Sequence, residues 1–238
     1  MTKSGSDDII ESIKSKKDGS AMKLEKMSEF FDARLEDYES HMLECIEEAK
    51  TFYPYTADLL PKSPKALILD LGCGTGLELD EYFRLNPTAE VTGIDLAPGM
   101  LSRLREKHKD KNLTLICDSY FDVELPRERY DAAVSVESLH HFTAEEKTPL
   151  YTKLCNSIKS NGYFILTDYF AANSEEEQRL RSQYLALKEE QNISDDVFYH
   201  FDTPLTVEHE VETLLKSGFK DVAILNKWCS TYALKAYK

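Results

Sequence analysis

The chain has 238 residues, with 43 acidic and 29 basic side chains and a formal net charge of −14. Hydrophobic residues make up 42%, enough for a substantial core, and this argues against wholesale disorder. The acidic balance argues against a broad basic face for nucleic acid and against docking on anionic membranes. No apolar run approaches the roughly 18–20 residues of a membrane-spanning helix, and the N-terminus lacks the apolar core of a signal peptide. We therefore expect a cytoplasmic protein with one large domain, or one domain with a small cap.

The five cysteines are widely spaced, and no pair forms a Cys-x-x-Cys motif. No set of cysteines and histidines has the spacing of zinc ligands, so the sequence predicts no metal centre. We interpret the cysteines as buried free thiols in a reducing compartment. They are Cys45, Cys73, Cys117, Cys155 and Cys229.

The N-terminal part of the chain is predicted to be helical. Residues 1–25 are rich in Ser, Lys and Asp and indicate either a mobile tail or a short docking helix. Residues 26–64 are predicted to form an N-terminal helical cap, because apolar side chains recur at helical spacing from Met27 to Phe52. This pattern predicts one or two amphipathic helices. Three prolines are then expected to break the chain into a connector, namely Pro54, Pro61 and Pro64.

From residue 65 the chain alternates short apolar runs with helical stretches. Strands are predicted at 66–72, 91–95, 113–117, 130–138 and 162–170. Helices are predicted between them at 77–85, 98–108 and 144–159. This alternation is typical of an α/β domain with a doubly wound parallel sheet, which we assign to residues 65–238.

The alternation is interrupted after the fifth predicted strand. Residues 174–193 are charged and helical, and we interpret about 171–205 as an inserted lid. A helix at 206–217 is followed by apolar runs at 219–226 and 231–237, which are close enough in sequence to form an antiparallel hairpin.

A glycine-rich loop follows the first predicted strand and precedes a helix. Its sequence is Asp70-Leu71-Gly72-Cys73-Gly74-Thr75-Gly76. Glycines at such a turn let the backbone approach a ligand closely. The dinucleotide fingerprint G-x-G-x-x-G would require glycine at position 77, which is Leu77 here. The carboxylate of Asp70 would repel a pyrophosphate, so the loop favours a ligand that carries positive charge.

Two further acidic residues follow the next strands. Asp95 ends the second predicted strand, where a carboxylate can accept hydrogen bonds from both ribose hydroxyls. Asp118 ends the third, beside Ser119, and could accept a hydrogen bond from the amine of an adenine. Because ligands of open α/β sheets bind at the carboxyl ends of the strands, we expect Asp70, Asp95 and Asp118 to lie around one crevice. The alternative is that each aspartate caps the helix after it.

These motifs together resemble the class I S-adenosylmethionine-dependent methyltransferases. The resemblance is carried by ILDLGCGTG, VTGIDLAPGML, CDS and YDAAVSVESLHHF, and it spans about residues 67–170. It implies a Rossmann-like, doubly wound, seven-stranded sheet whose last strand is antiparallel. It also implies S-adenosylmethionine as the cofactor.

The resemblance implies a set of cofactor-binding residues. Gly72, Cys73, Gly74 and Gly76 would pass under the methionine part of the cofactor, and Asp95 would bind its ribose. The other implied contacts are Leu96 and Met100 beside the adenine, Asp118 and Ser119 at the adenine edge, and Glu137 and Ser138 on the methionine side. From the helical face that carries them, we expect Arg34 or Tyr38 to contact the cofactor carboxylate.

A small-molecule acceptor is favoured over nucleic acid. The chain has Val136-Glu137-Ser138-Leu139 where the family's amino-group methyltransferases carry Asn/Asp-Pro-Pro-Tyr, and no proline precedes a cysteine. Methyl transfer from a sulfonium is an in-line displacement that needs alignment and exclusion of water. His140 and His141 follow the fourth strand and are candidates for a general base or a substrate-positioning group. The alternative is that one packs in the core and the other caps the next helix.

Three other interpretations stay open. The segments 205–219 and 232–236 are similar to carboxy-S-adenosylmethionine synthases and their relatives, although the glycine loop is that of an ordinary methyltransferase. The chain could instead modify a tRNA, which would require a local basic patch. It could also bind the cofactor without catalysis. The sequence leaves the oligomeric state open.

Overall fold

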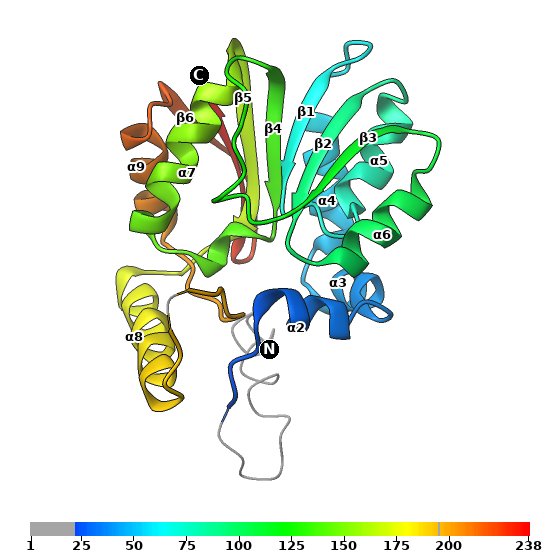
Figure 1. Ribbon diagram of the computed structural model, residues 1–238. Coiled ribbons are helices and arrows are strands. Elements are labelled where there is room, and N and C mark those ends of the chain that lie inside the picture. The colour runs from blue at the N-terminus through cyan, green and yellow to red at the C-terminus, as the bar shows by residue number, and fades with distance from the viewer. Residues whose placement is uncertain (1–21, 195) are drawn as a thin grey trace.

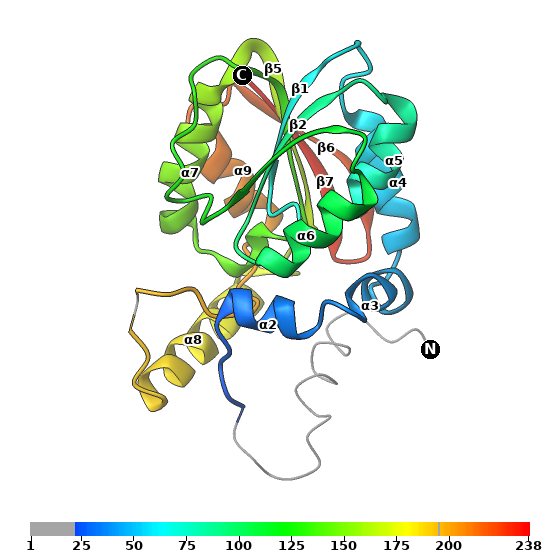
Figure 2. The ribbon, with the colours of Figure 1, turned by 45° about the vertical axis from the view of Figure 1, so that its right-hand side comes forward.

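The computed structural model describes residues 22–194 and 196–238. The prediction of a tail or docking helix at 1–25 therefore falls mostly outside the described residues. A central sheet lies between helices on both of its faces, with α7 and α9 toward one side and α4, α5 and α6 toward the other (Figures 1 and 2).

The strands lie close to their predicted positions. They are β1 (Leu67–Leu71), β2 (Glu90–Asp95), β3 (Asn112–Cys117), β4 (Tyr130–Val136), β5 (Ile158–Tyr169), β6 (Asp221–Trp228) and β7 (Thr231–Tyr237). The helices are α2 (Met27–Ala33), α3 (Tyr38–Cys45), α4 (Ala49–Leu59), α5 (Leu77–Leu85), α6 (Pro98–Lys107), η1 (Leu139–His141, a 3-10 turn), α7 (Ala144–Ser157), α8 (Ser174–Glu190) and α9 (Val207–Lys216).

The sheet has seven strands in the order β3-β2-β1-β4-β5-β7-β6. Neighbouring strands from β3 to β5 are parallel, whereas β7 runs antiparallel to both β5 and β6. The order reverses beside β1, so β1 and β4 flank the topological switch point at which open α/β sheets bind ligands. The predicted seven-stranded, Rossmann-like fold with an antiparallel last strand is confirmed, including the terminal hairpin.

The N-terminal helices differ from the prediction. In the part of the chain that the structure describes, three helices precede the sheet, and Pro54 lies inside α4 rather than breaking the chain. Its ring is on the exposed face of the helix, while Phe52 and Ala57 are fully buried. Proline removes only one backbone hydrogen bond, and burial of the opposite face against the core maintains the helix despite that loss. The helix ends at Leu59, before Pro61.

Residues of the insertion after β5 pair with the chain at the start of α2. Met27 N donates to the Phe198 carbonyl oxygen at 2.9 Å, and His200 N donates to the Glu25 carbonyl oxygen at 3.0 Å. Helix α8 stands away from the sheet, on the same side of the molecule as α2 (Figures 1 and 2). The backbone pairing therefore joins the predicted cap and the predicted insertion at the carboxyl edge of the sheet.

The cysteine prediction was wrong in part. Cys73 and Cys155 are buried free thiols, but Cys45, Cys117 and Cys229 are exposed. Cys117 is the last residue of β3, which lies at the edge of the sheet. In the described part of the chain, no helix combines the length and apolar character needed to cross a membrane.

Candidate active site

The glycine loop turns between the end of β1 and the start of α5. Gly72, Gly74 and Gly76 have positive φ angles of 72°, 48° and 74°. Gly72 N donates to the Ile94 carbonyl oxygen at 2.8 Å, and Gly74 N donates to Asp95 Oδ2 at 2.8 Å. The loop is thus anchored to the end of β2.

Gly72 is closely packed against Ser138, the first residue of the turn that leads into η1. A Cβ atom on Gly72 would lie 1.9 Å from Ser138 Oγ. No side chain fits at this distance, so glycine at position 72 is required by the close approach as well as by its positive φ. This contact brings the glycine loop directly against the segment that carries His140 and His141.

Two buried carboxyl groups behind the loop have oxygens without hydrogen-bond partners. These atoms are both carboxylate oxygens of Asp70, a residue that is 1% exposed, and Oε1 of Glu78 on the first turn of α5. Burial and the neighbouring Glu78 raise the pKa of Asp70 well above its usual value, and burial also raises the pKa of Glu78. A buried polar group without a partner is costly, so this pair favours a ligand that brings positive charge or hydrogen-bond donors.

The acidic residues at the ends of β2 and β3 do not cap helices. Asp95 accepts hydrogen bonds from Gly74 N and Ala97 N, each at 2.8 Å, and no side chain caps α5 or α6. Asp118 is exposed and accepts from Ser119 N at 2.8 Å. The alternative that these aspartates cap the following helices is therefore wrong for the described chain.

The remaining residues of the predicted adenine pocket lie at the same edge. Met100 on α6 is 1% exposed, Ser119 is 5% exposed, and Leu96 is half-buried. Asp32 of α2 accepts a hydrogen bond from Gly99 N at 2.9 Å, so α2 is held against the first turn of α6. Helix α2 is thus held against the segment that carries Leu96 and Met100.

Tyr38 and Arg34 occupy different environments. The Tyr38 hydroxyl would be 3.8 Å from a Cβ atom on Gly74, and burial together with Asp95 raises the pKa of this tyrosine. Arg34 instead forms an exposed ion pair with Glu25, at 2.9 Å between Nη2 and Oε1, and lies over the Phe30 ring. Of the two, only Tyr38 lies beside the glycine loop.

Glu137 follows β4 in a left-handed conformation with φ of 49°. This conformation is uncommon for a non-glycine residue and tends to occur at functional sites. Thr231 Oγ1 donates to Glu137 Oε1 at 3.0 Å, and Glu137 N donates to the Thr167 carbonyl oxygen at 2.9 Å. Burial and the nearby Asp168 raise the pKa of Glu137 to about 8.

His140 lies between carboxylates from two other segments. Its Nδ1 is 2.6 Å from Asp168 Oδ1, and because a carboxylate only accepts, the imidazole is the donor. Its Nε2 is 3.5 Å from Asp202 Oδ1. Burial opposes a charge on His140, but Asp168 and Asp202 outweigh it and hold the pKa well above its usual value.

His141 is buried beside the same aspartate. Its Nδ1 lies 3.1 Å from Asp202 Oδ1 and 3.2 Å from the Phe201 carbonyl oxygen. Burial and the charge of His140 lower the pKa of His141. His200, whose ring stacks on Phe30 at 3.6 Å between centroids, is also neutral because burial lowers its pKa to about 3.

The two histidines do not follow the alternative assignment from the sequence. Both are buried, and the side chain that caps α7 is Thr143, which forms a capping box with Glu146. Sequence reasoning missed Asp168 and Asp202 as their partners. Asp168 stands near the end of β5, as Asp95 stands at the end of β2, so the same rule could have found it. Asp202 lies in the insertion, where no strand marks its position.

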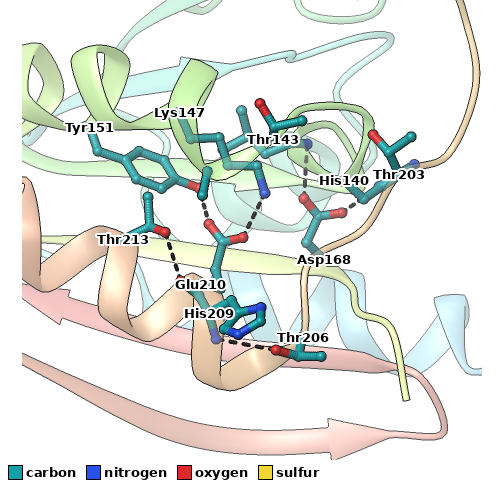
Figure 3. A network of polar contacts seen from close by, with 12 residues as sticks. His140, Thr143, Lys147, Tyr151, Asp168, Thr203, Thr206, His209, Glu210 and Thr213 are labelled. Carbon is teal, nitrogen blue, oxygen red and sulfur yellow. Dashed lines mark hydrogen bonds and ion pairs between the residues drawn. The ribbon is translucent and has the colours of Figure 1, made fainter. Parts of the chain in front are cut away.

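A separate buried ion pair lies beyond Asp168 (Figure 3). Lys147 Nζ on α7 is 2.6 Å from Glu210 Oε2 on α9, and Glu210 also accepts a hydrogen bond from the Tyr151 hydroxyl. The side chains of Lys147 and Glu210 are 2% and 0% exposed. This pair joins α7 to α9 and leaves no face open to a ligand.

Comparison with known proteins agrees with this geometry. Residues 68–162 match the family described as "Methyltransferase domain". The chain is 26% identical over 230 residues to carboxy-S-adenosyl-L-methionine synthase of Helicobacter pylori, covering 90% of this chain and 93% of that protein. It is 30% identical over 106 residues to malonyl-[acyl-carrier protein] O-methyltransferase of Anoxybacillus flavithermus, a match that spans 44% of this chain and only 40% of that protein.

The fold also has a counterpart among solved structures. The S-adenosylmethionine-dependent methyltransferase of Mesorhizobium loti superposes with a TM-score of 0.56 at 21% identity, over 78% of this chain and 96% of that chain. At this identity the likeness concerns the fold. The matched domain, the seven-stranded sheet and the glycine loop followed by acidic strand ends all support a likeness to the class I S-adenosylmethionine-dependent methyltransferases.

Proposed function

We propose that this protein transfers the methyl group of S-adenosylmethionine to a small-molecule acceptor. The observation that carries the proposal is the contact between Gly72 and Ser138, because it sets the cofactor loop directly against the turn bearing His140 and His141. Bound at the loop, the cofactor would supply an activated methyl group for in-line displacement. The chain itself would bind the cofactor and the acceptor, align them for transfer and exclude water.

The residues around the glycine loop fit this cofactor. The unpartnered oxygens of Asp70 suit a ligand with an ammonium and a sulfonium group, since an opposite charge compensates a buried carboxylate. Each Asp95 oxygen has a second lone pair beyond the backbone hydrogen bond it accepts, so both can also accept ribose hydroxyls. Tyr38 would cover the loop at Gly74.

The acceptor would lie beside Glu137, His140 and His141. These groups come from the segment after β4, next to the loop that would hold the methyl donor. They can hydrogen-bond an acceptor, and a histidine in its neutral form can take up the proton of a hydroxyl or thiol. Water is excluded because both histidines are less than 10% exposed.

A small acceptor is favoured over nucleic acid by the charges at this edge. Within the described residues, no lysine or arginine forms an ion pair with Glu137, Asp168 or Asp202. A polyphosphate backbone would meet no lysine or arginine paired with these acids, and affinity for nucleic acid depends on such basic contacts.

Transfer of a carboxyl-bearing group is the second candidate. It is favoured by the likeness to carboxy-S-adenosyl-L-methionine synthase, which extends over nearly the whole of both chains. The product distinguishes the two reactions, because methyl transfer yields S-adenosylhomocysteine and a methylated acceptor, whereas carboxy-S-adenosylmethionine formation leaves a modified cofactor.

The test is a panel of thiol, amine, phenol and carboxylate acceptors incubated with the full chain and S-adenosylmethionine. Products are followed by mass spectrometry, with His209→Gln as a control on a half-exposed histidine that pairs with Glu177. We expect S-adenosylhomocysteine and one methylated acceptor class. Failure of the protein to bind S-adenosylhomocysteine in calorimetry would refute the proposal, and a carboxylated cofactor would select the second candidate.

A further inference from the structure

We propose that His140, His141 and Asp202 form a binding site for one divalent transition-metal ion, and that this ion holds the acceptor. The ligand atoms are His140 Nε2, His141 Nδ1 and Asp202 Oδ1. Two imidazoles and one carboxylate on one side of an ion are a common donor set for Zn²⁺ and Fe²⁺, and they leave coordination positions free.

The distances among the three atoms match such a site. Asp202 Oδ1 lies 3.5 Å from His140 Nε2 and 3.1 Å from His141 Nδ1, and one ligand atom from each of the three residues lies within 4.8 Å of the other two. Ligand atoms about 2.0–2.1 Å from a tetrahedral ion are separated by roughly 3.3 Å. The triad is thus close to the required spacing before any ion binds.

Asp202 has a carboxylate oxygen without a hydrogen-bond partner at the proposed metal position. Its Oδ1 is buried and accepts no hydrogen bond within the described structure, although two imidazoles are next to it. Buried polar atoms almost always have partners, so this oxygen calls for one. His141 Nδ1 also faces the Phe201 carbonyl oxygen at 3.2 Å, a hydrogen bond that it would exchange for the metal.

Asp168 supports the proposed site by binding the ring nitrogen of His140 that does not face the ion. It accepts a hydrogen bond from His140 Nδ1 at 2.6 Å, so Nε2 is the ring atom that would release its proton and coordinate the ion. Metal-bound histidines commonly donate their second N–H to a carboxylate in this way. The same 2.6 Å separation is too short for Nδ1 and Asp168 to ligate one ion together, which excludes the other nearby combination, Glu137, His140 and Asp168.

The segment that carries Asp202 is fixed against the histidine turn. Thr203 N donates to the His140 carbonyl oxygen and Thr203 Oγ1 donates to the His141 carbonyl oxygen, both at 2.9 Å. Phe201 is buried and stacks on Tyr184. The ligands therefore come from two segments that are already held together, as a metal site requires.

This inference rests on the proposed function and deepens it. An ion at this position would offset the charge of Asp168 and Asp202 and so admit an acceptor with an oxygen or sulfur ligand. Hydroxyl and thiol acceptors, including anionic ones that the acids alone would repel, become the expected substrate class. A metal-bound hydroxyl or thiol also loses its proton more readily.

The experiment uses Co²⁺ as a probe. The full chain is stripped with a chelator and titrated with CoCl₂, with absorption of visible light and calorimetry as readouts. His140→Gln, His141→Gln and Asp202→Asn are compared with His209→Gln, a control in which a half-exposed histidine that pairs with Glu177 is removed. Circular dichroism and S-adenosylhomocysteine binding show that each variant is folded.

We expect one equivalent of Co²⁺ per chain, without a thiolate charge-transfer band, and a loss of affinity of at least about tenfold in each ligand variant. His209→Gln should bind like the original chain. The inference is overturned if the chain binds no Co²⁺, if binding persists in the ligand variants, or if thiolate bands appear. If S-adenosylhomocysteine still binds and methyl transfer continues, only the metal site is refuted. If S-adenosylhomocysteine does not bind, the proposed function itself is refuted.

Discussion

Asp168 fixes the orientation of His140 through the 2.6 Å contact between Oδ1 and Nδ1. The carboxylate is itself held by two backbone groups, since Leu139 N donates to Oδ2 at 2.8 Å and Tyr169 N donates to Oδ1 at 2.9 Å. Burial raises the pKa of Asp168, but His140 outweighs this and lowers it overall. The imidazole is thereby locked with Nε2 facing Asp202.

Replacing Asp168 with Asn should weaken metal binding without affecting the cofactor loop. An amide is nearly the same shape, but it lacks the charge that orients the imidazole and makes it more basic. Loss of such an outer partner typically costs about 10- to 100-fold in metal affinity. We expect this decrease for Co²⁺, measured by titration, with an unchanged affinity for S-adenosylhomocysteine. An unchanged Co²⁺ affinity would show that Asp168 does not position His140.

Asp70→Asn should stabilise the protein increasingly as the pH rises. Burial and Glu78 raise the pKa of Asp70, so the folded chain binds more protons than the unfolded chain between the unfolded value, about 3.9, and the raised value. The contribution of Asp70 to the free energy of unfolding is therefore lost as the pH increases through that interval. Asn does not titrate and avoids this loss.

The measurement is the melting temperature of both proteins across a pH series, without cofactor. The difference in favour of Asp70→Asn should be small near pH ~4 and should grow toward neutral pH. Asp58→Asn, an exposed site on α4, serves as the control with no such trend. A constant difference, or a less stable Asp70→Asn at neutral pH, would contradict a pKa of Asp70 that is raised by burial and by Glu78.

Most of the sheet could be predicted from the sequence because each strand is a compact apolar run between turn signals. The strand from Leu67 to Leu71 is almost entirely buried, and its glycine-rich end marks the turn. The helices before the sheet were harder to predict, since Pro54 is a local breaking signal that tertiary burial of Phe52 and Ala57 overrides. Local patterns carry no information about that packing.

Some residues of the candidate site could likewise be predicted from the sequence, and others could not. Asp70 and Asp95 could be located because the ends of parallel strands converge by topology, whatever the side-chain packing. The partners of the histidines could not be located, because Asp202 reaches them only through the fold of the insertion. The ion pair of Arg34 with Glu25 also depends on how α2 meets the chain before it.

Gly72→Ala should impair folding or abolish cofactor binding through a specific collision. Its Cβ would lie 1.9 Å from Ser138 Oγ, so the loop or the histidine turn must move. Removing the obstacle in Gly72→Ala/Ser138→Gly should restore part of the S-adenosylhomocysteine affinity, although the positive φ of residue 72 still costs about 1 kcal/mol. Calorimetry compares the three proteins. A double variant no better than Gly72→Ala would show that Ser138 is not the obstacle.

Glu210→Gln should strongly destabilise the fold. The change leaves the ammonium of Lys147 buried without its charged partner, a loss of about 3–5 kcal/mol in the free energy of unfolding. Lys147→Met/Glu210→Gln should recover part of this, because no unpaired charge remains. Glu212→Gln, on the same helix but in an exposed pair with Lys216, should change stability by less than about 0.5 kcal/mol in denaturant unfolding. Equal effects at positions 210 and 212 would refute the role of burial.

Calorimetric titration of S-adenosylhomocysteine into the full chain and into Asp95→Ala tests the central claim, that the cofactor binds at the carboxyl edge of the sheet. Hydrogen bonds to a charged group contribute about 1.5–3 kcal/mol each. We therefore expect one saturable site in the original chain and an affinity at least about tenfold lower in Asp95→Ala. Asp58→Ala should bind like the original chain. Absence of binding to the original chain, or equal affinities in it and Asp95→Ala, would contradict the claim.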